Sequence, residues 1–212
     1  MHVLVAGSHG QVGQHVTRLL AEGDHEVRGM VRDEAQTSDI EDLGAEAVLA
    51  DLTEDVTSAV EGCDAVVFAA GSGGDDVWGV DRDGAINIIE TAEDGDVDRF
   101  VMLSSINADS PEESPEELRE YLKAKAEADE RLRESDLTYS IVRPGALTNE
   151  EGTGKIRTGA DLDRKGDDIP REDVAATLVA ALPMESTHGQ TFEVLSGDEP
   201  IEQALESPLD GE

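Results

Sequence analysis

The chain has 212 residues, enough for one domain with a small appendage. Its 50 acidic and 16 basic side chains give a formal net charge of −34. This charge argues against binding to nucleic acid or to anionic lipid, because both need clustered lysine and arginine. The acid is spread along the whole chain and lysine is scarce. That pattern is typical of proteins from halophiles, in which concentrated salt screens the repulsion.

Cysteine count and apolar runs restrict the class further. Cys63 is the only cysteine, which excludes a disulfide framework and a cysteine-based zinc site. A strand pattern begins at His2, so we expect no signal peptide. No apolar run approaches the roughly 18 residues that span a bilayer. We therefore expect a cytoplasmic protein that does not bind membranes.

Apolar runs alternate with segments of helical periodicity along the chain. Seven strands are predicted, over residues 2–6, 26–31, 45–50, 64–70, 99–104, 137–142 and 191–195, the first of them buried. Helices are predicted over residues 12–22, 77–92, 114–133 and 173–182. The third of these begins at Ser114-Pro115, a helix-start signal. The alternation predicts an α/β fold of the Rossmann type, a doubly wound parallel sheet of about seven strands with helices on both faces.

One domain is expected over residues 1–205. Residues 146–168 are rich in Gly, Asp and Thr, which predicts a loop on the substrate side of that domain. Residues 206–212 are predicted to be a frayed polar tail.

The first predicted strand runs into a glycine-rich loop, and a helix follows. Glycines at this spacing permit a tight turn, the approach of a pyrophosphate and close packing of helix on strand. The helix N-terminus offers N–H groups and partial positive charge to phosphates. We therefore predict a dinucleotide site rather than a tight turn alone, with His9 at the surface. The predicted cofactor-binding residues of this loop are Gly7, Ser8, Gly10, Gln11, Val12 and Gly13.

The ends of the next strands indicate which dinucleotide binds. Arg32 stands where an NAD site has an acid, and a guanidinium suits a 2′-phosphate, so NADP is favoured over NAD. Asp33 is the contrary sign, because a shift of one residue would make the acid the reader of the ribose. Further cofactor contacts are predicted at the ends of the third and fourth strands, from Asp51, Leu52, Ala69, Ala70 and Gly71.

Several motifs resemble the short-chain dehydrogenase/reductase superfamily. They are the glycine loop, Tyr121-x-x-x-Lys125, the serine segment 101–105, the Arg-Pro-Gly segment 143–145 and residues 171–175. The resemblance covers nearly the whole chain. It is nearest to the small atypical NAD(P)-binding proteins grouped with NAD-dependent epimerases and dehydratases. It implies that Pro144 passes the nicotinamide and that Lys125 binds the nicotinamide ribose.

The tyrosine and lysine have a physical rationale of their own. Four residues apart on a helix places both side chains on one face. An ammonium nearby stabilises a phenolate, so Tyr121 can exchange a proton with a carbonyl or alcohol while hydride moves to or from a nicotinamide. In the alternative, Tyr121 packs in the core with Leu118 and Leu122, and Lys125 is solvated.

Two positions depart from the family pattern. The catalytic serine or threonine of the family falls on Ile106, so Ser105 is the candidate in its place, or else a plain strand-end serine. The family's asparagine on the fourth helix falls on Asp81. Asp81 is interpreted as bridging waters, pairing with Arg82 or facing solvent. The predicted catalytic residues are Tyr121, Lys125, Ser105 and Asp81.

These observations favour an NADP-dependent oxidoreductase that acts on a small carbonyl, quinone or flavin-like compound. The alternatives are a non-catalytic NAD(P)H-binding redox sensor and an epimerase or dehydratase. The length leaves no room for the substrate domain of enzymes that act on nucleotide sugars. No metal site is expected, because the acidic side chains of the predicted loop are interpreted as exposed to solvent. They are Asp161, Asp163, Asp167 and Asp168. The expected partner is a small-molecule substrate, and the choice between monomer and homodimer stays open.

Overall fold

The computed structural model describes residues 1–163 and 168–207. Nine strands form one sheet, in the order β11-β8-β10-β6-β5-β4-β1-β2-β3. Seven of them are parallel: β1 (His2–Ala6), β2 (Glu26–Val31), β3 (Glu46–Leu49), β4 (Ala65–Phe68), β5 (Arg99–Leu103), β6 (Thr138–Pro144) and β10 (Gln190–Ser196). These are the seven predicted strands, so the Rossmann-type prediction is confirmed.

The two further strands make the sheet larger than predicted. β8 (Lys155–Gly159) pairs antiparallel with β10, and β11 (Glu199–Pro200) pairs antiparallel with β8. The segment predicted as a loop thus contains β8. It also contains β7 (Ala146–Thr148), which forms a separate two-stranded sheet with β9 (Asp168–Pro170). Sequence periodicity missed these strands because they are short and expose part of their side chains.

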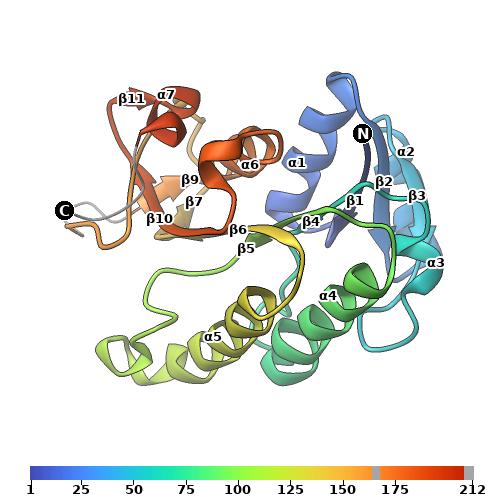
Figure 1. Cartoon of the computed structure of the whole chain (residues 1–212), viewed down its shortest axis with the longest axis horizontal. Coiled ribbons are helices and arrows are strands. Elements are labelled where there is room, and N and C mark those ends of the chain that lie inside the picture. The colour runs from blue at the N-terminus through green and yellow to red at the C-terminus, as the bar shows by residue number, and fades with distance from the viewer. Residues whose placement is uncertain (164–167, 208–212) are drawn as a thin grey trace.

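Helices cover both faces of the sheet (Figure 1). One core packs under α1 (Gln11–Glu22), α2 (Thr37–Glu41), α6 (Arg171–Ala181) and α7 (Ile201–Glu206). The other packs under α3 (Thr57–Val60), α4 (Ala85–Asp94) and α5 (Arg119–Arg133). Because each central strand is buried on both faces, its sequence is a continuous apolar run, as in Val-Leu-Val-Ala of β1.

Two predicted helices begin differently from the sequence pattern. The one predicted from Ser114 starts at Arg119, because Pro115 is extended (φ −50°, ψ 144°) and only a 3-10 turn over Glu116–Leu118 separates it from α5. The one predicted over residues 77–92 is divided into a π-helix over Val77–Gly84 and α4.

Some expectations fall outside the described residues. Positions 164–167 of the predicted loop, with Asp167, and positions 208–212 of the predicted tail are among them. Glu206, the first residue of that tail, is the last residue of α7. Within residues 1–163 and 168–207, none of the helices has the length and apolarity to cross a membrane.

Candidate functional site

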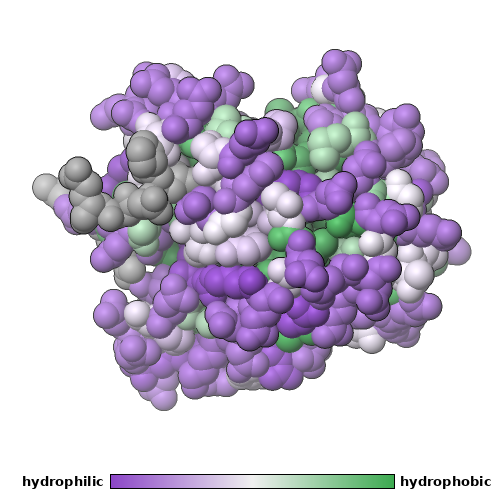
Figure 2. All heavy atoms as spheres, in the orientation of Figure 1, coloured by the Kyte–Doolittle hydropathy of each residue, from purple (hydrophilic) through white to green (hydrophobic). Residues whose placement is uncertain are grey.

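A cavity of about 890 Å³ opens at the carboxyl edge of the sheet. In the strand order, β1 and β4 lie side by side although β2 and β3 follow β1 in sequence, so the chain winds away from this point in both directions. Ligands of doubly wound sheets bind in the crevice at such a point. Apolar side chains show between hydrophilic ones near the middle of this face, between α6 and α1 on one side and α4 and α5 on the other (Figure 2).

The cavity brings together most of the side chains that the sequence singled out. The predicted residues that line it are Gly7, Gly10, Gln11, Val12, Arg32, Asp51, Leu52, Ala69, Ala70, Gly71, Asp81, Ser105, Tyr121, Lys125 and Pro144. Ser8 and Gly13 do not line it. The hydroxyl of Ser8 is buried and donates to the Met30 carbonyl at 2.8 Å. A Cβ on Gly13 would lie 2.0 Å from the Gly7 carbonyl oxygen, so Gly13 lets α1 pack against the loop.

The glycine loop fits a diphosphate. Gly7 has φ +83°, and a Cβ there would lie 2.5 Å from the Ala70 Cα, so the turn requires glycine. Gly10 is the N-cap of α1, and none of the described side chains caps this end or places an acid in its first turn. The first N–H groups of α1 therefore have no partner within the helix, which is what an anion at a helix N-terminus needs.

Arg32 and Asp33, the two candidates to bind the ribose 2′ position, have different surroundings after β2. Arg32 is exposed and lines the cavity. The carboxylate of Asp33 instead accepts the backbone N–H of Ala35 at 2.9 Å and caps a 3-10 turn. Hydrogen bonds from Thr53 lower the pKa of Asp51, which follows the neighbouring strand β3, and the charge of Arg32 lowers it further. Arg32, the residue that follows β2, is thus the one of the two candidates that lines the cavity.

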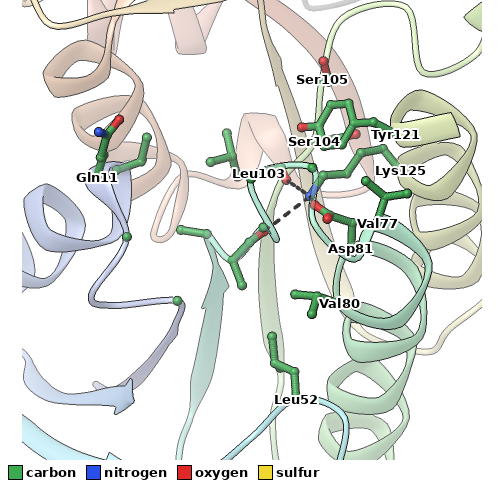
Figure 3. Close-up of a pocket in the computed structure, with 18 of the residues that line it drawn as sticks. Gln11, Leu52, Val77, Val80, Asp81, Leu103, Ser104, Ser105, Tyr121 and Lys125 are labelled. Carbon is green, nitrogen blue, oxygen red and sulfur yellow. Dashed lines mark hydrogen bonds and ion pairs between the residues drawn. The ribbon is translucent and has the colours of Figure 1, made fainter. Parts of the chain in front are cut away.

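Lys125 lies at the centre of the site and is buried (Figure 3). Its Nζ is 3.4 Å from the Asp81 carboxylate, 3.4 Å from the Ala70 carbonyl and 3.5 Å from the Leu103 carbonyl. The Tyr121 ring centroid is 5.7 Å from the same nitrogen. The predicted pairing of Tyr121 and Lys125 on one face of α5 is present, and the lysine is not solvated.

Asp81 neither faces solvent nor pairs with Arg82, which corrects two of its three sequence interpretations. It is only 1% exposed, its Oδ1 faces Lys125, and its Oδ2 accepts hydrogen bonds from the backbone and hydroxyl of Ser72. Arg82 pairs instead with Asp83 and Glu127. The π-helix explains the difference, because its wider turn rotates later side chains relative to an α-helix and turns Asp81 into the cavity.

The paired serines after β5 have separate environments. The Ser104 hydroxyl donates to Asp129 at 2.8 Å, whereas the Ser105 hydroxyl has one long hydrogen bond of 3.3 Å, to the Ile106 carbonyl. Ser105 is therefore the serine whose hydroxyl can turn to a ligand. Asp129 also accepts from Arg143, and burial raises the pKa of this carboxyl despite that pairing. The sequence signal for Asp129 was its place one turn beyond Lys125 on α5.

Further residues line the cavity that the sequence did not assign to the site. Val77, Leu103, Leu118 and Leu147 add apolar side chains to the lining of the cavity, and Arg171 adds a cation. Within the described part of the chain, no group of three or more His, Cys, Asp or Glu side chains could hold a metal ion.

Comparison with known proteins agrees with this geometry. The sequence profile of a family described as NAD(P)H-binding matches residues 7–185. A Bacillus subtilis protein named an uncharacterized sugar epimerase is 44% identical over 213 residues, which is 97% of this chain and 99% of that protein. A Bacillus halodurans protein, provisionally named an NAD-dependent epimerase/dehydratase, superposes with a TM-score of 0.93 at 42% identity, covering 97% of this chain and 99% of that one.

The oxidoreductase ylbE from Lactococcus lactis superposes with a TM-score of 0.87 at 30% identity, covering 97% of this chain and 95% of that one. These matches confirm the resemblance drawn from the motifs, and they extend over the strands, the glycine loop and the Tyr121 helix alike. The chain belongs to the NAD(P)H-binding family of Rossmann-type, oxidoreductase-like proteins.

Proposed function

We propose that this protein is an NADP-dependent oxidoreductase that reduces a small carbonyl, quinone or flavin-like compound. The observation that carries the proposal is that a single cavity is lined by the phosphate loop, by Arg32 and by the pair Tyr121 and Lys125. A dinucleotide bound along the phosphate loop and Arg32 would extend to Tyr121 and Lys125. The size of the cavity lies within the range of cofactor and ligand sites.

Preference for NADP rests on Arg32. Its guanidinium lies at the cavity, and a guanidinium can bind a 2′-phosphate through paired, charge-assisted hydrogen bonds. Asp33, which would favour a 2′-hydroxyl, is turned to the Ala35 backbone. In a chain of net charge −34, a cation at this place is also needed to offset repulsion of the phosphates.

A bound nicotinamide supplies hydride chemistry, and the chain supplies the proton and the geometry. Tyr121 is partly exposed to the cavity and is the proton donor to the substrate oxygen. The Asp81 carboxylate and two backbone carbonyls hold the Lys125 ammonium in place. Its charge is therefore fixed beside the Tyr121 ring. Ser105 offers a hydroxyl to the same substrate oxygen. The apolar lining from Val77, Leu103, Leu118 and Leu147 suits a flat, weakly polar substrate better than a sugar.

A second candidate, a non-catalytic sensor of NADPH, is favoured by one observation. The carboxylate of Asp81 lies 3.4 Å from Lys125 and offsets the charge that would otherwise stabilise a Tyr121 phenolate. A protein tuned in this way could bind the dinucleotide and signal through the loop that follows Ser72, without reducing a substrate.

An assay of NADPH oxidation distinguishes the oxidoreductase from the sensor. It is run in about 2–3 M KCl, where the salt screens the repulsion between the acidic side chains. The acceptors are a panel of aldehydes, ketones, quinones and free flavin. The proposal predicts turnover with at least one acceptor, lost on Tyr121→Phe while NADPH still binds. Tight NADPH binding with no turnover across the panel would favour the sensor, and turnover unaffected by Tyr121→Phe would contradict the tyrosine mechanism.

A further inference from the structure

Arg171 lies where the main cavity meets a smaller one. It lines the main cavity and also a second cavity of about 280 Å³. Gln11, the first residue of α1, lines both as well. Arg171 therefore shares both cavities with the end of α1 whose N–H groups have no helical partner, which is the end of the site that the glycine loop predicts to hold phosphate.

The guanidinium is held in place without a carboxylate partner. Its Nη1 donates to the Leu147 carbonyl at 3.1 Å and to the Asn149 side-chain oxygen at 2.9 Å. No ion pair among residues 1–163 and 168–207 includes Arg171. The two acids that follow it in sequence are engaged elsewhere, since Glu172 accepts the N–H of Gly152 and Asp173 that of Gly154.

The local sequence position does not favour a cation. Arg171 is the first residue of α6, directly after Pro170, and the positive end of a helix macrodipole repels a cation there. The next two residues of the first turn, Glu172 and Asp173, are acids, which the macrodipole favours at this end of a helix. Local physics that is violated at one position points to a function at that position. The surroundings are also short of acid, because no Asp or Glu lines the second cavity of this strongly acidic chain.

We propose that Arg171 is a second phosphate anchor that binds the diphosphate of the dinucleotide, opposite the N-terminus of α1. The guanidinium groups of Arg32 and Arg171 then bind different phosphates of the dinucleotide. Arg32 meets the 2′-phosphate, which only NADP carries, and Arg171 meets the diphosphate, which NAD and NADP share. This inference rests on the proposed dinucleotide site and deepens it.

The test is the dissociation constant of NADPH, NADH and 2′-AMP, measured by calorimetric titration of the full chain in about 2 M KCl, on wild type and variants. Loss of a charge-assisted contact in Arg171→Ala weakens NADPH and NADH alike, by about tenfold or more. The same variant leaves 2′-AMP, which has no diphosphate, within about twofold of wild type. Arg32→Ala gives the reverse pattern, a large loss for NADPH and 2′-AMP and little for NADH.

Arg18→Ala is the matched control, because Arg18 is an exposed cation that lines the second cavity but not the main one. Its NADPH and NADH constants stay within about twofold of wild type. If Arg171→Ala leaves both dinucleotides unchanged, or weakens 2′-AMP as much as NADH, the inference is overturned while the dinucleotide site stands. If wild type binds neither NADPH nor NADH, the proposed function fails with it.

Discussion

Replacing Asp81 by asparagine tests the central ion pair of the site. Asp81 and Lys125 have side chains that are 1% and 3% exposed, with Oδ1 and Nζ 3.4 Å apart. Removing one charge from a buried pair leaves the other uncompensated, which costs about 3–5 kcal/mol. Asparagine keeps the shape and one acceptor for Ser72, so we expect the lower end, about 3 kcal/mol. For a chain of this size the melting temperature then falls by about 6–12 °C.

The assay is thermal and denaturant unfolding in molar KCl of Asp81→Asn, Lys125→Met and the double variant. Each single change leaves one buried charge unpaired, and the double change leaves none, so the double variant should be less destabilised than the sum by about 2 kcal/mol. Asp83→Asn, an exposed acid on the same π-helix, is the control and should stay within about 0.5 kcal/mol. Additive losses, or Asp81→Asn unfolding like the control, would refute the buried pair.

Further predictions concern the cofactor loop, pH and salt. Gly10→Val should abolish NADPH binding in calorimetric titration while the fold persists, since the side chain intrudes on the phosphate site. Gly13→Ala should lower the melting temperature sharply, because its Cβ would lie 2.0 Å from the Gly7 oxygen. Burial and the charge of Arg99 lower the pKa of His188, so the free energy of unfolding should decline as pH falls from about 7 to about 5, and His188→Asn should flatten that decline. NADPH affinity should survive or improve from about 0.1 to about 3 M KCl, because screening weakens the repulsion between the acidic chain and the phosphates more than it weakens close contacts; a steady collapse of affinity in folded protein would contradict this.

Sequence alone could predict the parallel sheet and the phosphate loop, because both depend on patterns among residues that are close together in the chain. β1 and β4 are unbroken apolar runs, and the loop joins a strand directly to a helix. β8 and β11 could not be found in this way, since their existence depends on pairing with β10, a contact between distant parts of the chain. Tertiary pairing of this kind leaves little periodicity behind.

The candidate site divides along the same line. The spacing of Tyr121 and Lys125 on α5 was readable, because it depends only on helix geometry. The orientation of Asp81 was not predictable, because a helical pattern in the sequence does not show that the chain forms a π-helix there. Arg171 belongs to the segment 171–175 that resembles the family, but its place between two cavities depends on how α6 packs beside α1.

The most direct test of the account is a single-turnover measurement of NADPH oxidation, with the dissociation constant of NADPH measured separately. It compares wild type with Tyr121→Phe, using an acceptor that the wild type reduces. Tyr121→Phe is expected to slow the chemical step by about 10²–10⁴-fold, the usual contribution of a general acid, and to leave NADPH binding unchanged. An equal rate in both proteins would contradict the claim that this cavity is an oxidoreductase site with Tyr121 as its proton donor.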